Sequence, residues 1–151
     1  MTKQPSKKSV TAWAKLVRIQ TLLLNKINNS LKEAGLPPLA WYDVLLELER
    51  SGRDGLRQYE IGTKILLPKH NLSRLIDRLE TEGLVERQAC PEDGRGNIVR
   101  ISPAGVSMRK TMWPVYGAEL YASIERKLEP EKLTALDDIL TNLLDEAVDD
   151  S

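Results

Sequence analysis

The chain has 151 residues, a formal net charge of zero, 41% hydrophobic residues and 29% charged residues. These values are typical of a globular protein with a packed core, and no apolar run approaches the roughly 20 residues that a membrane-spanning helix needs. One cysteine and one histidine exclude an intramolecular disulfide, a cysteine-cluster zinc site and a histidine-cluster metal site. We therefore expect no metal, no cofactor, no membrane partner and a location in the cytoplasm, since residues 1–10 also lack the apolar segment of a secretory signal.

The charges are distributed unevenly. Residues 1–52 carry 8 basic and 4 acidic side chains, residues 53–110 carry 11 and 8, and residues 111–151 carry 3 and 10, which gives net charges of +4, +3 and −7. This asymmetry predicts that one face of the molecule meets an anionic partner, whereas the acidic C-terminal third faces solvent or another subunit.

The first predicted elements are a tail and a long helix. Residues 1–9 have no hydrophobic periodicity, which predicts a flexible N-terminal tail. Residues 10–35 are predicted to form a helix that Gly35 ends. Its apolar face is wider than an edge helix needs, so we expect a second subunit to cover part of it. The apolar residues are Trp13, Leu16, Val17, Leu23, Leu24, Ile27 and Leu31.

The middle of the chain predicts two further helices and a minimal strand. Apolar residues spaced three and four apart from Trp41 to Leu48 indicate a helix, and Asp43 is expected to interact with the dipole of its first turn. Residues 56–57 are predicted as a short strand. Residues 58–65 are predicted as a third helix in which Gln58 stands at the capping position and caps poorly.

A fourth helix is predicted, with Pro68 in its first turn. It is expected to end at Gly83 in a left-handed conformation. Its apolar residues share one face, which we expect to be buried. Its other face carries short polar and basic side chains of the kinds that bind phosphates and the edges of bases. These are His70, Asn71, Ser73, Arg74, Asp77 and Arg78.

Two short strands are predicted at residues 84–90 and 97–101, with Pro91-Glu92-Asp93-Gly94-Arg95-Gly96 between them. A helix followed directly by a β-hairpin is the winged helix-turn-helix arrangement, in which the helix enters the major groove of DNA and the hairpin tip reaches the minor groove. Arg95 is the expected minor-groove residue, and Asp93 is expected to hold its guanidinium group. The alternative is that Asp93 and Arg95 only form a tight loop.

Two helices are predicted at the C-terminal end. Ser102 and Pro103 form a helix start signal, and the helix that follows is expected to continue to Leu128. Pro130 begins the last helix. Its broad apolar face is expected to pack with that of residues 10–35 across a twofold axis.

These motifs resemble the MarR (multiple antibiotic resistance regulator) family of winged helix-turn-helix transcriptional regulators. The resemblance is carried by residues 71–80, 83–85, 90–96 and 101–105, and by the spacing between them. It implies a mainly α fold with a small β-wing. The implied DNA-binding domain spans residues 39–101, and the implied dimerisation helices span residues 10–35 and 102–148.

The resemblance further implies a regulator and not an enzyme: a homodimeric repressor that a small effector releases from a pseudo-palindromic operator on double-stranded DNA. Arg74 is expected to read guanine through two hydrogen bonds, and Lys69 and Arg78 to hold phosphates. Asp77 is expected to orient a basic neighbour. The polar residues expected to contact either bases or phosphates are His70, Asn71 and Ser73.

Three alternatives stay open at this stage. Trp13, Trp41 and Tyr42 either line an effector pocket or belong to the core. Cys90 is a structural thiol or a redox sensor, and its place on a strand favours the first. The whole chain could also be a winged-helix protein-interaction module that does not bind DNA, although Arg74, Arg78 and Arg95 argue against it.

Overall fold

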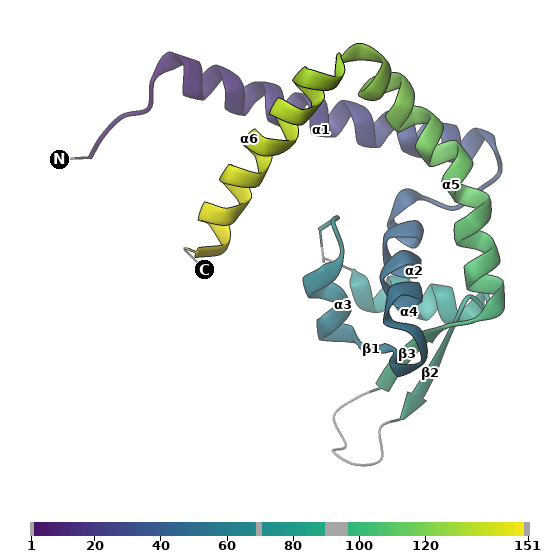
Figure 1. Cartoon of the computed structure of the whole chain (residues 1–151). Coiled ribbons are helices and arrows are strands. Elements are labelled where there is room, and N and C mark those ends of the chain that lie inside the picture. The colour runs from purple at the N-terminus through teal and green to yellow at the C-terminus, as the bar shows by residue number, and fades with distance from the viewer. Residues whose placement is uncertain (1, 69–70, 90–96, 150–151) are drawn as a thin grey trace. The chain divides into compact units, whose positions relative to one another are not determined.

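The structure is a computed structural model that describes residues 2–68, 71–89 and 97–149 (Figure 1). It is mainly helical with one small antiparallel sheet, which confirms the predicted fold class. No helix in these residues is both long and apolar enough to cross a membrane. The helices are α1 (Lys7–Glu33), α2 (Leu39–Ser51), α3 (Gln58–Lys64), α4 (Leu72–Thr81), α5 (Pro103–Ser123) and α6 (Pro130–Asp149), and the strands are β1 (Leu56–Arg57), β2 (Val85–Ala89) and β3 (Asn97–Ile101).

The chain divides into two compact units, residues 1–116 and residues 117–151, and α5 contributes to both. The core of the first unit lies between α2, α3, α4 and the sheet. Its central side chains are at most 2% exposed, as apolar side chains spaced for one buried face should be. They are Val44, Leu45, Leu48, Ile61, Ile76, Leu79, Val85 and Val99.

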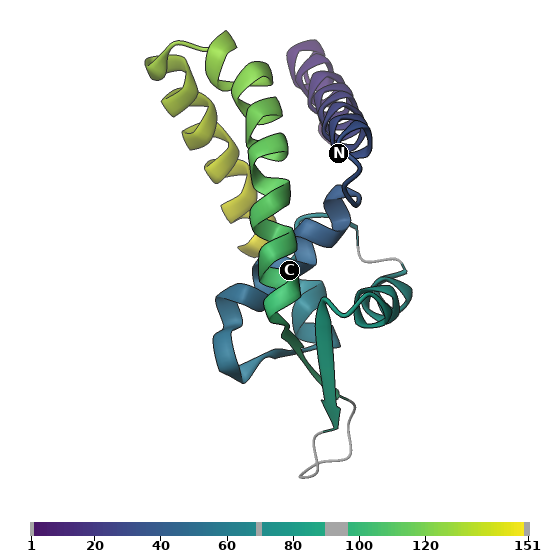
Figure 2. The same cartoon turned by 90° about the vertical axis from the view of Figure 1, so that its right-hand side faces the viewer.

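The sheet has the strand order β1-β3-β2, and both neighbours of β3 are antiparallel to it. Val99 lies opposite Leu56 on one side and Arg87 on the other. β2 and β3 form the predicted hairpin and extend away from the helices (Figure 2). The short strand predicted at residues 56–57 is confirmed as β1.

Helix α1 begins earlier than predicted. The Ser9 amide donates to the Ser6 hydroxyl oxygen at 3.1 Å, so the helix is capped there and starts at Lys7 instead of Val10. The last three residues of the expected tail are therefore helical. At the other end, Gly35 adopts φ +73°, which confirms that a left-handed glycine follows the helix.

Helix α5 starts as predicted. The Ser102 hydroxyl accepts a hydrogen bond from the Gly105 amide at 3.1 Å and donates one to the Gly83 carbonyl at 2.6 Å. A Cβ on Gly105 would lie 2.2 Å from the Leu84 carbonyl oxygen, so only glycine fits this close approach. These contacts fix the first turn of α5 against the end of α4 and the start of β2.

In the second unit, the helix predicted to reach Leu128 ends at Ser123. Ile124 leaves helical geometry, with φ −121° and ψ −64°, and a 3-10 turn follows at Glu125–Lys127. Helix α6 begins at Pro130 as predicted. Several large apolar side chains of α6 are more than half exposed, namely Ile139, Leu143 and Leu144.

Candidate nucleic-acid interface

Helix α4 has the two faces that its sequence predicts. Leu72, Ile76 and Leu79 are at most 8% exposed and lie in the core of the first unit. The other face exposes polar and basic side chains to solvent, and among the described residues neither of its arginines forms an ion pair. These exposed residues are Asn71, Ser73, Arg74 and Arg78. Lys69 and His70 lie outside the described residues.

Helix α4 begins later than predicted. The expected first turn with Pro68 is wrong, because Pro68 lies in a non-helical turn and the helix starts at Leu72. Asn71 precedes it with φ +69°, a left-handed conformation that asparagine tolerates better than most residues. The exposed face of α4 is therefore about one helical turn shorter than the sequence suggested.

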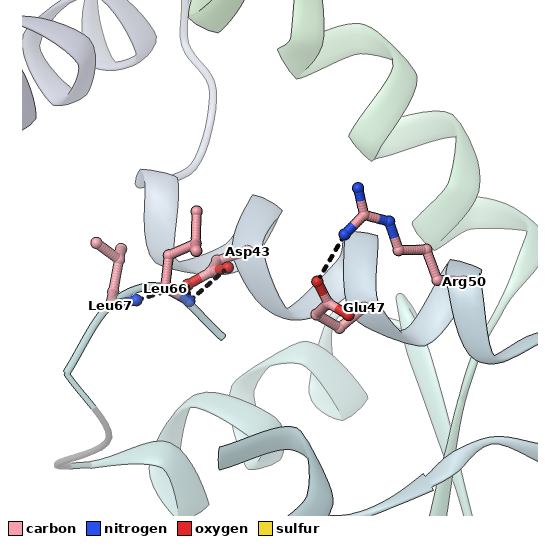
Figure 3. A network of polar contacts seen from close by, with 5 residues as sticks. All are labelled: Asp43, Glu47, Arg50, Leu66 and Leu67. Atoms are coloured by element: carbon pink, nitrogen blue, oxygen red, sulfur yellow. Dashed lines mark hydrogen bonds and ion pairs between the residues drawn. The ribbon is translucent and has the colours of Figure 1, made fainter. Parts of the chain in front are cut away.

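Asp43 holds the turn that leads into α4. It was expected to interact with the dipole of α2, but its carboxylate is buried and accepts hydrogen bonds from the Leu66 amide at 2.9 and 3.1 Å and from the Leu67 amide at 2.9 Å (Figure 3). More than 20 residues of sequence separate donor and acceptor. No local spacing rule could therefore have revealed this contact.

Asp77 has the basic neighbour that was expected, and this neighbour is Arg87 on β2. The two side chains are 2.5 Å apart, and the same guanidinium group lies 4.0 Å from Glu80. Sequence reasoning missed Arg87, because the register of the hairpin against α4 is a tertiary feature. The ion pair neutralises Asp77 on the face that exposes Arg74.

The wing strands contribute a second arginine with a structural role. The guanidinium group of Arg100 donates to the Gln88 side-chain oxygen at 2.5 Å and to the Arg53 carbonyl at 2.6 Å. These bonds tie β3 to β2 and to the turn after α2. Three residues singled out from the sequence, Cys90, Asp93 and Arg95, lie outside the described residues.

A groove of about 750 Å³ runs between the N-terminal end of α2 and α4. Trp41 lines it from α2, and Arg74 and Arg78 line it from α4. Three acidic residues, Asp43, Asp77 and Glu82, also line it. Pro38, Leu67 and other residues add apolar walls. Such a groove offers a small ligand apolar walls and charged side chains of both signs.

The other two aromatic residues proposed for an effector pocket have different surroundings. Tyr42 is 6% exposed and packs against Trp113 and Tyr116, with ring centroids 6.2 and 5.1 Å away. Burial raises the pKa of Tyr116, and the nearby Tyr42 and Asp43 add to that rise. Trp13 is 66% exposed on α1.

The same junction between α2 and α5 contains an ion pair. Arg109 donates from Nε to Glu49 at 2.9 Å, and both side chains are less than one-third exposed. This hydrogen bond to Glu49 is the main reason that the pKa of Arg109 is raised. Arg109 is therefore engaged within the fold, in contrast to the arginines exposed on α4.

The described residues contain no group of three potential metal-ligating side chains, and their arrangement is that of a winged helix whose outer helix exposes two arginines. The sequence model of the MarR family matches residues 34–96. The transcriptional regulator MhqR of Bacillus subtilis is 29% identical over 126 residues, which is 83% of this chain and 85% of MhqR.

Solved structures show the same fold. AbsC, a MarR family transcriptional regulator from Streptomyces coelicolor, has 27% identity and a TM-score of 0.81 over 97% of this chain and 98% of that one. Sco3205, a MarR family regulator from the same organism solved in complex with DNA, has 23% identity and a TM-score of 0.85 over 97% of this chain and 91% of that one.

Proposed function

We propose that the chain is a DNA-binding transcriptional regulator of the MarR family, and that it acts as a homodimeric repressor that a small effector releases from a pseudo-palindromic operator. The observation that carries this proposal is the exposed face of α4, where Arg74 and Arg78 point away from the core. Such a regulator binds chromosomal DNA, so we also propose a cytoplasmic location.

We assign base reading to the middle of α4. Arg74 has the forked donor geometry that pairs with O6 and N7 of guanine, and Ser73 and Asn71 lie beside it on the exposed face. Arg78 lies one turn further on and holds a backbone phosphate. Lys69 and His70, immediately before the helix in sequence, extend this contact, so the helix enters the major groove with its N-terminal half.

We assign minor-groove contact to the wing. β2 and β3 extend away from the helices and are braced by Arg100, which gives the hairpin a fixed direction (Figure 2). Arg95 follows β2 by six residues and is drawn to the negative potential of a narrow groove. Asp93 orients its guanidinium group.

We propose that the terminal helices form the dimer. One winged helix covers one half-site only, and a pair related by a twofold axis presents two recognition helices to successive major grooves. Helix α1 supports this assignment, because large apolar side chains along it are about half exposed or more. These are Val10, Trp13, Ile19 and Leu22. Helix α6 exposes Ile139, Leu143 and Leu144 in the same way.

We place the effector in the groove between α2 and α4. A ligand with an aromatic body would pack against Trp41, and its anionic group would pair with Arg74 or Arg78. The same arginines then cannot bind DNA, so occupancy of the groove lowers operator affinity directly. Tyr42 and Trp13 are not needed for this site, since the first is packed in the α2–α5 junction and the second lies exposed on α1.

Retardation of the protein's own promoter fragment over a salt series tests the function. We expect a specific complex whose affinity falls steeply as salt rises, because each phosphate contact releases counterions. A complex that forms equally on unrelated DNA, or a flat salt response, would contradict the assignment. Benzoate, as a simple aromatic anion, should weaken the DNA complex of the wild type more than the DNA complex of Trp41→Ala. Equal weakening of the two complexes would contradict an effector site in the groove.

A further inference from the structure

The buried carboxylate of Asp43 forms no ion pair with the described residues, although a buried charge is normally paired. Its partners are instead the amides of two consecutive residues, Leu66 and Leu67, which together donate to both carboxylate oxygens at 2.9 to 3.1 Å (Figure 3). Successive backbone N–H groups form a concave site for an anion. Here the anion is a side chain from another helix.

This contact lies in the connection that leads into α4. Leu66 and Leu67 lie in the seven-residue connection between Lys64, the end of α3, and Leu72, the start of α4. Asn71 at the N-terminal end of α4 makes no capping hydrogen bond through its side chain with the described residues. The Asp43 carboxylate is therefore a polar anchor that ties the connection before α4 to α2.

The apolar contacts of α4 do not replace that anchor. Leu72, Ile76 and Leu79 fix which face of the helix is buried, but apolar contacts are non-directional and permit small shifts along the helix axis. Hydrogen bonds at 2.9 Å with defined angles do not permit such shifts. An arginine reads guanine through two simultaneous hydrogen bonds, so a shift of about 1 Å in α4 already weakens sequence discrimination.

We propose that Asp43 is the positioning residue of the DNA-reading helix: it sets the location of the N-terminal half of α4 and so determines how strongly the protein prefers its operator over other DNA. Asp43 itself is buried and touches no DNA. This inference rests on the proposed role of α4 as the reading helix.

The neighbouring carboxylate on the same helix provides a matched control. Glu47 lies one turn after Asp43 and pairs with Arg50 of the same helix at 2.9 Å (Figure 3). The Arg50 side chain is 66% exposed and the Glu47 side chain is 13% exposed, so the pair is open to solvent on the side of its arginine. Glu47→Gln and Asp43→Asn remove the same charge from the same helix, and only the second removes an acceptor from the turn before α4.

The test compares full-length wild type, Asp43→Asn and Glu47→Gln for binding to the operator and to a scrambled duplex, at a temperature where thermal unfolding shows each to be folded. Asp43→Asn should lose about tenfold or more in operator affinity and keep its affinity for scrambled DNA within about threefold, because phosphate contacts tolerate a shifted helix. Glu47→Gln should match the wild type on both. A merely structural role for Asp43 would leave the ratio of the two affinities unchanged.

A second variant keeps the test decisive if Asp43→Asn does not fold. Replacing the amide of Leu66 by an ester deletes the N–H that contacts both carboxylate oxygens and leaves every side chain in place. It should reduce the preference for the operator in the same direction. An unchanged preference in the folded variant would overturn the positioning role, whereas failure of the wild type to prefer any operator would instead overturn the proposed role of α4.

Discussion

The core between α2, α4 and the sheet and the long helix α1 use apolar residues in similar patterns but with opposite outcomes. Leu45 and Leu48 are fully buried by other elements of the same chain, whereas Trp13 of α1 is 66% exposed and Val10 is 53% exposed. Within α1 only Ile27 and Leu31 near its C-terminal end are buried. The first region buries its apolar side chains within one chain, and the second exposes the apolar surface that we propose a second subunit covers.

This difference separates stability from assembly. Substitutions in the core should lower the free energy of unfolding of each subunit, whereas substitutions along α1 should act on association and leave the fold of the single chain intact. Substitutions on the exposed face of α4 should leave the free energy of unfolding and the association of subunits unchanged, and should change DNA affinity. The four predictions that follow test these separations in order of decreasing effect.

The largest effect is expected from Leu45→Ala. The side chain is fully buried, and its truncation leaves a cavity, which typically costs about 2–5 kcal/mol in the free energy of unfolding. Thermal or urea unfolding measures this loss. Leu16→Ala on α1 is the control, because that side chain is 41% exposed, and equal losses for the two variants would remove the distinction between the regions.

Trp13→Ala should weaken association by about 2 kcal/mol, since exposed tryptophans on an apolar face are frequent hot spots of interfaces. Sedimentation over a concentration series measures the dimer dissociation constant. The secondary structure seen by circular dichroism should stay unchanged. An unaltered dissociation constant would show that the exposed face of α1 is not the interface.

Arg74→Ala should weaken operator binding by about 1–3 kcal/mol and reduce discrimination at one base pair. Arg126→Ala, which removes the same charge from an exposed turn of residues 117–151, is the matched control and should have little effect. Fluorescence anisotropy on labelled duplexes gives both affinities. A similar loss for both variants would reduce the role of Arg74 to net charge.

The smallest effect is expected from Arg87→Gln. Its ion pair with Asp77 is partly exposed, with the two side chains 23% and 59% accessible, and pairs of this kind contribute about 0–1 kcal/mol to stability. Unfolding should therefore change little. Operator affinity should fall slightly, because the carboxylate of Asp77 is then uncompensated beside the DNA, and a gain in affinity would contradict this reading.

The order and type of the elements could be predicted because local signals agree with the fold. The apolar spacing of Leu72, Ile76 and Leu79 indicated the buried face of α4, and the Ser102-Pro103 signal gave the start of α5. The predicted strands at residues 56–57 and 97–101 were also found, since turn residues and strand-forming residues alternate there.

Contacts between distant segments could not be predicted in this way. The start of α4 was placed too early because the turn before it is held by Asp43, and α1 was started too late because the Ser6 cap lies outside the apolar stripe. Gln58 was expected at the cap of α3, but Arg57 takes that position and its amide donates to Glu60 at 3.0 Å. Arg87 was not predicted as the partner of Asp77, because the two residues meet only when the hairpin packs beside α4.

The proposed function requires that two copies of α4 read one operator. A photo-crosslinking residue in place of Ser73, on the exposed face of α4, tests it on the full-length protein bound to operator DNA. We predict crosslinks to bases at two positions related by the operator's symmetry and separated by about one helical turn, or about 10 base pairs. Crosslinks to a single position, or to no base while the protein remains bound, would contradict it.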